Sequence, residues 1–338
     1  MPMSAELPSS ELLSFSRTCS SPSAGASAQP RTHAQSAYLW ACAMDVAVRK
    51  PGNVSLHSAG HDMRARQFLD SARASASALF DSRSGVGARI EAAVRATRAV
   101  AGCNTNLGIL LLSAPLACAV EGRGGLGGLG SLGGLEWTAS SLAAQLQTAL
   151  EAVLRALDVD DARAAYRAIA TAHPGGLGTA PEQDVAAEPD VGLRAAMRLA
   201  ADRDLIARQY ANGYAEVFGL GLAAFAVPTL PKQMTLAQRV QRVYLAWLSA
   251  HPDSHIVRKQ GEPAARAVSA EAARWRDRLE IDPDVAEGVE FAAWDESLKA
   301  RGLNPGTSAD LTVCTLFVAA LLTPGLCGQG MGDLDAML

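Results

Sequence analysis

Two stretches of this chain decide its fold: Leu107-Gly-Ile-Leu-Leu-Leu-Ser-Ala-Pro-Leu-Ala-Cys-Ala-Val120 and Leu311-Thr-Val-Cys-Thr-Leu-Phe-Val-Ala-Ala-Leu-Leu322. Each is apolar on nearly every face of a helix, which is the pattern of a helix surrounded by other helices. Segments such as 64–80 and 269–280 have one polar face instead. The sequence therefore predicts two central buried helices with amphipathic helices packed outside them.

Helical periodicity continues along the rest of the chain. The 338 residues are 49% hydrophobic but only 5% aromatic, a composition that favours helices over a β-sandwich. No stretch of more than a few residues alternates with β-branched enrichment, so strands find little support. We expect an all-α fold made of one large helical domain. The predicted helices are 34–48, 64–80, 86–101, 105–120, 136–157, 160–171, 191–218, 234–249, 263–280, 283–300 and 308–322.

Other segments lack this periodicity. Residues 1–32 are rich in Ser, Ala and Pro and are expected to form a disordered extension before an all-helical domain at 33–323, with a flexible tail at 324–338. Arg123 to Gly134 contains G-x-G-x-x-G, but no strand precedes it, so it is interpreted as a flexible connection. The long loop from Pro174 to Asp190 is expected to cover a site.

Charge and cysteine usage exclude several classes of function. The formal net charge is −4 and the pI about 5.9, so no basic field points to a nucleic acid. The six cysteines form no C-x-x-C pair, which indicates a reducing compartment. The longest apolar run is shorter than the roughly 20 residues that span a bilayer, and no secretory signal opens the chain. We expect a cytoplasmic protein without membrane association.

Polar clusters, most of them placed just before Ala/Leu-rich segments, are the candidate functional sites. Glycine lets the backbone approach a ligand, and a helix N-terminus offers unpaired N–H groups to an anion. Single caps would explain one or two polar residues, but three together before each central helix favour a ligand site. The clusters are Lys50-Pro-Gly-Asn-Val54, Gly60-His-Asp-Met63, Gly102-Cys-Asn-Thr-Asn-Leu-Gly108, Asp253-Ser-His255 and Asn304-Pro-Gly-Thr-Ser-Ala-Asp310.

The carboxylates in these clusters favour magnesium over zinc. His57 and His61 have helical spacing, but Gly60 breaks the helix and no third nitrogen or sulfur ligand is near. Asp62 and Asp310 are hard oxygen ligands that suit Mg²⁺ on a polyphosphate, although each could also be a solvated helix cap. We expect Lys50, Asp62, Asn104, Asp253 and Asp310 to converge on one pocket.

Four of the motifs, in this order, resemble the triphosphoribosyl-dephospho-CoA synthase family, which serves citrate lyase and malonate decarboxylase. They are Lys50-Pro-Gly-Asn-Val54, His61-Asp-Met63, Gly102-x-Asn-Thr-Asn-x-Gly108 and Pro305-Gly-x-Ser-Ala-Asp-Leu311. The resemblance implies an all-helical transferase that takes ATP, expels adenine and joins the triphosphoribosyl group to the ribose 2′-hydroxyl of 3′-dephospho-CoA.

For such an N-glycoside displacement the enzyme has to hold the triphosphate, stabilise an oxocarbenium-like sugar and position a base. Asp253 or His255 is the candidate base, and Asp62 and Asp310 are the candidate Mg²⁺ ligands. The candidate substrate and phosphate contacts are Lys50, Gly52, Asn53, His61, Asn104, Thr105, Asn106, Arg258, Lys259 and Ser308.

Two motifs depart from the citrate-lyase members. Those members tend to have Asn-Thr-His-Lys-Gly and Asp-Thr-Asn where this chain has Asn104-Thr-Asn-Leu-Gly108 and Asp253-Ser-His255. Both departures resemble a divergent branch found in methanogens and methylotrophs, where the acceptor could belong to methanopterin-type cofactor synthesis. The same residues would also suit a non-catalytic nucleotide-binding helical protein or a hydrolase that needs no acceptor. Only the non-catalytic protein would leave ATP intact.

Overall fold

The computed structural model describes residues 32–121, 139–173, 183–226, 234–323 and 325–328. The predicted extension 1–32, apart from Thr32, and the Gly-rich connection from Arg123 to Gly134 lie outside these residues. So do Pro174 to Gly178 and most of the predicted tail 324–338.

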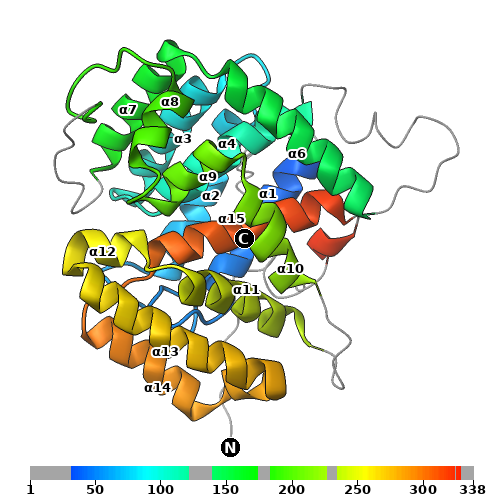
Figure 1. The fold of residues 1–338 in the computed structure, drawn as a ribbon, viewed down its shortest axis with the longest axis vertical. Coiled ribbons are helices and arrows are strands. Elements are labelled where there is room, and N and C mark those ends of the chain that lie inside the picture. The colour runs from blue at the N-terminus through cyan, green and yellow to red at the C-terminus, as the bar shows by residue number, and fades with distance from the viewer. Residues whose placement is uncertain (1–31, 122–138, 174–182, 227–233, 324, 329–338) are drawn as a thin grey trace, which may run out of the picture. The chain divides into compact units, whose positions relative to one another are not determined.

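The regular secondary structure of the described ranges is helical, which confirms the predicted all-α fold (Figure 1). The α-helices are α1 (His33–Ala47), α2 (Ala65–Leu79), α3 (Val86–Ala101), α4 (Leu107–Glu121), α6 (Ala139–Ala156), α7 (Val159–Ala172), α8 (Leu193–Ala200), α9 (Leu205–Asn212), α10 (Leu222–Phe225), α11 (Leu236–Ala250), α12 (Ser254–Gln260), α13 (Glu262–Ile281), α14 (Val289–Ala300) and α15 (Gly306–Leu322). A π-helix (Val217–Gly221) and two 3₁₀ turns (Pro283–Glu287 and Leu326–Gly328) accompany them. No helix in these ranges has both the length and the apolar character needed to cross a membrane.

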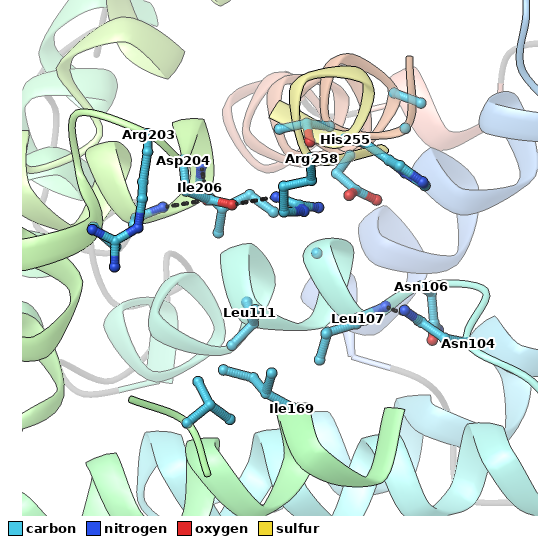
Figure 2. A pocket seen from close by; sticks show the side chains of 18 of the residues that line it. Asn104, Asn106, Leu107, Leu111, Ile169, Arg203, Asp204, Ile206, His255 and Arg258 are labelled. Carbon is cyan, nitrogen blue, oxygen red and sulfur yellow. Dashed lines mark hydrogen bonds and ion pairs between the residues drawn. The ribbon is translucent and has the colours of Figure 1, made fainter. Parts of the chain in front are cut away.

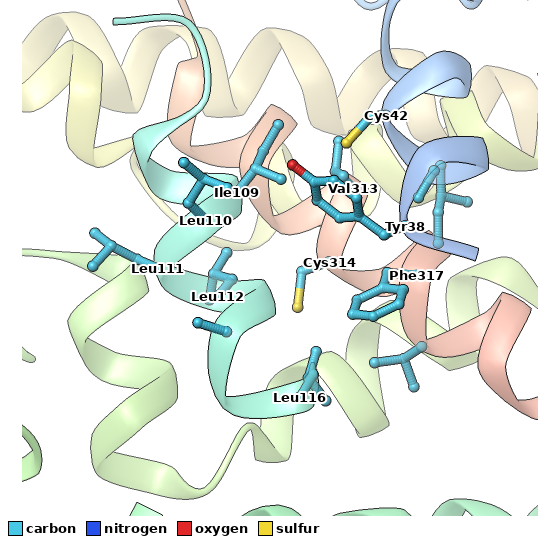
Figure 3. Packing of buried hydrophobic residues seen from close by; sticks show 14 of the residues in the cluster. Tyr38, Cys42, Ile109, Leu110, Leu111, Leu112, Leu116, Val313, Cys314 and Phe317 are labelled. Carbon is cyan, nitrogen blue, oxygen red and sulfur yellow. The ribbon is translucent and has the colours of Figure 1, made fainter. Parts of the chain in front are cut away.

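The two predicted central helices are α4 and α15, and they pack against each other. Every residue of α15 from Leu311 to Leu322 is buried, as is nearly all of α4. Figure 3 shows Cys314 and Phe317 of α15 lying beside Leu112 and Leu116 of α4. Tyr38 of α1 packs edge-on against Phe317, with ring centroids 6.1 Å apart. The all-round apolar pattern of the two segments therefore identified the core correctly.

Pro115 creates a defect inside α4 that another helix repairs. Proline has no N–H, so the carbonyl of Leu111, four residues earlier, loses its helical donor. The hydroxyl of Tyr210 on α9 donates to this carbonyl at 2.6 Å, and that of Tyr214 donates to the next carbonyl, Leu112, at 3.0 Å. Both tyrosines are completely buried. The proline thus fixes where α9 docks on the central helix.

The prediction of one continuous helix over 191–218 is wrong. It is divided into α8, α9 and the beginning of the π-helix. Asp204 accepts hydrogen bonds from the N–H groups of Ile206 and Ala207 and starts α9 as its N-cap. Gly213, in the left-handed conformation at φ 69°, ends α9. Capping side chains overrode the periodicity, and the resulting turn at 201–204 brings Arg203 and Asp204 to a cavity.

Two further boundaries differ from the predicted helices. Between 249 and 263, where no helix was predicted, the structure has the short helix α12. The helix predicted over 283–300 begins instead as the 3₁₀ turn Pro283–Glu287 before α14. Helices α11, α13 and α14 pack around a second cluster in which Trp275 stacks on Trp294 with centroids 5.8 Å apart. This part of the fold carries Asp295 and Lys299, which hold the loop at Gly52.

Replacing Tyr210 by Phe should destabilise the protein by about 1–3 kcal/mol, because the buried carbonyl of Leu111 then has no donor. Tyr214→Phe is the matched control: it removes the same atom, but Leu112 keeps the N–H of Leu116 within its own helix. Urea unfolding of the two variants tests this. Equal losses would show that the proline defect is not what Tyr210 repairs.

Candidate functional site

A cavity of about 400 Å³ opens between α4, α7, α8, α9, α12 and α15. Figure 2 shows its two ends. Asn104, Asn106 and His255 lie at one end, whereas Leu111 and Ile169 lie at the other. The polar and charged side chains that line it are Asp45, Asn53, Asn104, Thr105, Asn106, Tyr166, Gln183, Asp184, Arg203, Asp204, His255, Arg258, Asn304, Thr307 and Asp310.

Asp253 joins the N-termini of two helices that reach this cavity. One carboxylate oxygen, Oδ1, accepts from the N–H groups of His255 and Ile256 at 2.9 and 3.1 Å, so it caps α12. The other, Oδ2, accepts from the N–H and the hydroxyl of Ser308 at 2.7 and 2.8 Å, near the start of α15. Burial raises the pKa of Asp253, while the hydrogen bonds from Ser308 and Ile256 lower it. Asp253 does not line the cavity.

His255 reaches the cavity from the first turn of α12. Its Nδ1 lies against Gly306, where a Cβ would come within 2.5 Å of it. Its Nε2 is buried and has no hydrogen-bond partner in the described part of the chain. Burial, together with the charges of Arg258, Lys259 and His61, lowers the pKa of His255 to about 3. The imidazole is therefore neutral at physiological pH and offers a free polar atom to a ligand.

Asp310 enters the cavity from the second turn of α15, beyond the positions that cap a helix. None of the hydrogen bonds found among the described residues ends on its carboxylate, so it is not acting as the helix cap that the sequence left open. A Cβ on Gly108 would overlap its Oδ2 atom, which shows that glycine at the start of α4 makes room for the carboxylate. Burial raises the pKa of Asp310 well above its usual value, and the nearby charge of Asp45 raises it further.

Lys50 is fully buried behind this wall of the cavity. Its ammonium lies 3.0 Å from Oδ1 of Asp45 and also donates to the backbone carbonyl of Asp45. Asp45 itself lines the cavity, and burial raises its pKa while Lys50 lowers it. Lys50 thus balances the charge of a lining carboxylate instead of projecting into the cavity itself.

The loop that follows Lys50 is held from several sides. The N–H of Gly52, which has φ 82°, donates to Asp295 at 2.8 Å, and the carbonyl of Gly52 lies 2.8 Å from Nε2 of His61. Asn53 donates from Nδ2 to Oδ1 of Asn304 at 3.0 Å. These contacts keep the amide of Asn53 at the cavity wall.

The three polar residues before α4 have different tasks. Asn104 Oδ1 accepts from the N–H of Leu107 at 3.1 Å, so it caps the helix. Thr105 donates to the hydroxyl of Ser71 at 2.7 Å. Asn106 accepts from Thr97 at 3.0 Å, and its Nδ2 remains buried without a partner among the described residues. One residue is therefore sufficient for capping, and Asn106 has a donor to spare for a ligand.

Unpaired polar atoms are concentrated around this cavity. Buried polar groups are normally hydrogen-bonded, so each exception calls for an explanation such as a ligand that binds there. Within the described ranges, five lining residues each carry a buried atom without a hydrogen-bond partner: Asp45 Oδ1, Asn53 Oδ1, Asn106 Nδ2, His255 Nε2 and Arg258 Nε. The Asp45 atom has the ion pair with Lys50 described above. The cavity thus suits a charged ligand that both donates and accepts hydrogen bonds.

Arg258 supplies a cation at the cavity. Its Nη1 donates to Asp204 at 2.7 Å, which ties α12 to the cap of α9. Arg203, the residue before Asp204, also lines the cavity and is exposed. Figure 2 shows the contact between Asp204 and Arg258 across the gap between their helices.

The structure brings together part of the predicted site. Lys50 and Asp253 contact the lining residues Asp45 and His255. Gly52, His61 and Ser308 do not line the cavity and have their hydrogen bonds with other residues behind its wall. The predicted residues that line the cavity are Asn53, Asn104, Thr105, Asn106, His255, Arg258 and Asp310. Asp62 and Lys259 are exposed and do not line it. The two predicted metal ligands, Asp62 and Asp310, are therefore not brought to one cavity. Of the five residues predicted to converge, Asn104 and Asp310 line the cavity, and Lys50 and Asp253 contact lining residues from behind its wall. Asp62 is exposed and outside the lining.

Several lining residues were missed from the sequence. Asp45 is the only charged residue in the predicted helix 34–48, and a charge within an otherwise uncharged helix is a signal that could have identified it. Asn304 belongs to a predicted polar cluster but was not itself predicted to contact a ligand. Arg203 and Asp204 were hidden inside a segment predicted to be a continuous helix.

The lining carboxylates could share a cation with a substrate. No group of three or more His, Cys, Asp or Glu side chains in the part of the chain that the structure describes could hold a metal alone. Magnesium, however, is usually bound by one or two carboxylates together with substrate phosphates and water. Asp45 and Asp310, buried beside each other at the cavity, fit that requirement.

Asp253→Ala should destabilise the protein by about 3 kcal/mol or more, because buried N–H groups at two helix ends lose their only described acceptor. Asp158→Ala, which removes the exposed cap of α7, should cost about 1 kcal/mol. Urea denaturation of both variants measures the difference. Similar losses of unfolding free energy in the two variants would show that Asp253 acts as an ordinary helix cap.

Comparison with known proteins gives two findings. The model of the family described as ATP:dephospho-CoA triphosphoribosyl transferase matches residues 31–326. Among solved structures, the chain resembles a protein of Archaeoglobus fulgidus provisionally assigned as a triphosphoribosyl-dephospho-CoA synthase, with 22% identity and a TM-score of 0.53 over 74% of this chain and 97% of that one. No curated protein matches the chain. The structural likeness, at this identity, concerns the fold.

Proposed function

Because this chain belongs to the ATP:dephospho-CoA triphosphoribosyl transferase family, we propose that its cavity transfers the triphosphoribosyl group of ATP to the ribose 2′-hydroxyl of 3′-dephospho-CoA and releases adenine. The observation that carries the proposal is the set of four buried polar atoms without a partner among the described residues, on Asn53, Asn106, His255 and Arg258, in a cavity that two carboxylates, Asp45 and Asp310, also line. A ligand with a polyphosphate, sugar hydroxyls and a cation would satisfy such a set.

In the proposed reaction, the bond between C1′ and N9 of ATP breaks, and its electron pair leaves with adenine. The hydroxyl oxygen of the acceptor forms the new bond to C1′. The hydroxyl proton passes to a base, and adenine takes up one proton as it departs, so that protons balance overall. A carboxylate near C1′ stabilises the positive charge that develops on the sugar. Asp310, free of hydrogen bonds from the described residues, is our candidate for this electrostatic role as well as for metal binding.

Asp45 and Asp310 are the proposed Mg²⁺ ligands. When bound, the ion would neutralise the triphosphate and make its entry beside two carboxylates favourable. Burial raises the pKa of Asp45, and the ion pair with Lys50 opposes this by favouring the ionised carboxylate. Gly108 leaves the space that the carboxylate of Asp310 fills. Asp62, exposed and outside the lining, is replaced by Asp45 in this proposal.

His255 is the proposed general base, and Asp253 becomes a positioning residue. His255 lines the cavity, its imidazole is neutral, and its Nε2 has no hydrogen-bond partner among the described residues, so this nitrogen is free to accept a proton. The carboxylate of Asp253 already accepts four hydrogen bonds and lies outside the cavity, so it holds His255 and α15 in place. Arg258 supplies charge for the phosphates, and Asn53, Asn104 and Asn106 supply amide groups for phosphate or ribose oxygens.

Two residues of the cavity bear on the identity of the acceptor. His255 and Asn106 are residues at which the sequence departs from the citrate-lyase members, and both line the cavity. Ribosyl transfer to an acceptor of methanopterin-type cofactor synthesis is therefore the alternative. Incubation with ATP, Mg²⁺ and each acceptor, followed by mass spectrometry, distinguishes them. Adenine release without an acceptor would indicate a hydrolase, and intact ATP a non-catalytic binding protein.

Asp310→Asn should lower the rate of adenine release by at least about a hundredfold, because the isosteric amide removes a charged metal ligand. Measured without metal, its melting temperature should equal or exceed that of the wild type, since a carboxyl group whose ionised form is disfavoured by its surroundings has been replaced by a neutral amide. Added Mg²⁺ with ATP should raise the melting temperature of the wild type and not that of the variant. A fully active variant contradicts the assignment.

His255 should leave two signatures in pH dependence. Its pKa, lowered to about 3, keeps it neutral, so kcat/KM for ATP should show no acid limb near the ordinary histidine pKa of about 6.5. The unfolded chain binds the proton first as pH falls below about 6.5. The wild type should therefore lose about 2 kcal/mol of stability relative to His255→Asn between pH 8 and pH 5. If the unfolding free energies of the two proteins changed with pH in parallel, His255 would not be a buried neutral histidine.

A further inference from the structure

The end of the cavity farthest from the polar cluster has a different chemistry. Its walls are Leu111 on α4, Ile169 on α7, Ala196, Met197 and Ala200 on α8, and Ile206 on α9. Figure 2 shows Leu111 and Ile169 on one side and Ile206 on the other. We call these six residues the apolar chamber. None of these six carries a charge or a strong side-chain hydrogen-bonding group, so a phosphate or an ammonium group packed against them would lose its hydration without compensation from them.

We propose that the apolar chamber holds the base of the nucleotide, a planar uncharged heterocycle, while the carboxylate end holds the triphosphoribosyl group. The proposal rests on the proposed function and adds to it the place of the leaving group. It also predicts that selectivity among nucleotides is set by α8 and α9, which contain none of the family-like motifs.

The chamber lies at the right place for a base attached to a sugar beside Asp310. A Cβ on Gly108 would meet both the carboxylate of Asp310 and, at 2.7 Å, Cδ1 of Ile206, so the metal-binding end and the chamber adjoin at this glycine. Leu111 lies three residues further along α4, about 4.5 Å at 1.5 Å per residue. A ribose placed at Asp310 would therefore direct its base along α4 into the chamber.

The walls also suit a flat ring. Ala196 and Ala200 are four residues apart and thus share one face of α8. Both alanines line the cavity, as do the branched side chains of Leu111 and Ile169, and a methyl group occupies little of the space that a ring would need. Binding sites for small molecules typically combine such apolar walls with a few polar groups that orient the ligand. Here the amides and the carboxylate of Asp310 lie at the sugar end, and Tyr166, Gln183, Asp184 and Arg203 line the cavity on the side of α7 and α8. The exposed guanidinium of Arg203 can stack on a ring.

Filling the chamber should separate the base from the phosphates. Ala200→Leu, which lengthens a lining side chain, is expected to weaken the affinity for ATP at least tenfold. It should change the affinity for Mg²⁺ with inorganic tripolyphosphate, which has no base, by less than twofold. Ala195→Leu is the matched control, because Ala195 lies on the same helix but is exposed and outside the lining. Isothermal titration with both probes measures these values, and thermal unfolding confirms that each variant is folded.

Adenine alone supplies a second measurement that needs no variant. Free adenine should compete with ATP for the wild type and should not compete with tripolyphosphate. Equal loss of both probes in Ala200→Leu, unchanged ATP affinity in that variant, or no competition by adenine would each overturn the proposal. Because these are binding measurements, they also separate the two claims. A wild type that binds ATP through the chamber but releases no adenine with any acceptor contradicts the proposed function alone.

Discussion

The carboxylate of Asp253 is the interaction on which the site depends. It is fully buried and accepts two hydrogen bonds from the start of α12 and two from Ser308 near the start of α15. One of these helices carries His255 and Arg258, and the other carries Asp310. Helix N-termini leave donors unsatisfied, and a single buried anion satisfies donors of both ends at once. The distance between the proposed base and the proposed metal ligand is thus fixed by one residue that touches neither substrate nor metal.

Close approach of the backbones completes this arrangement. Gly108 admits the carboxylate of Asp310 against α4, and Gly306 admits the ring of His255 against α15. Each glycine removes the Cβ that would otherwise fill the position of a functional side chain. The same principle operates at Pro115, where a missing N–H creates a need that Tyr210 meets from α9. The helices around the cavity are therefore joined by close contacts at glycines and by a hydrogen bond to a carbonyl that the proline leaves without a donor, in addition to hydrophobic packing.

The fold was largely predictable because helical periodicity is a local property. Leu311 to Leu322 is apolar all round, and no tertiary information is needed to place it in the core. The polar clusters were visible for the same reason. What the sequence could not reveal is pairing over long separations. Asp253 and Ser308 are 55 positions apart, so Asp253 looked like a base in its own cluster. Asp62, next to a motif histidine, looked like a ligand, although a left-handed turn at φ 61° leaves it exposed. Asp45, inside an apolar helix, gave a signal only in retrospect.

If the proposed function holds, the electrostatics of the cavity require the triphosphate and its cation to enter together. Asp45 and Asp310 are buried near each other, Lys50 is already paired with Asp45, and Arg258 is already engaged by Asp204. A triphosphate alone would add several negative charges to a surface that is already acidic, which is unfavourable at short range in a medium of low dielectric constant. A divalent cation between the two reverses the sign of that interaction. In the proposed function, the acidic end of the cavity is therefore expected to select a metal-bound polyphosphate, and the apolar chamber beyond Gly108 to take the uncharged base of the same molecule.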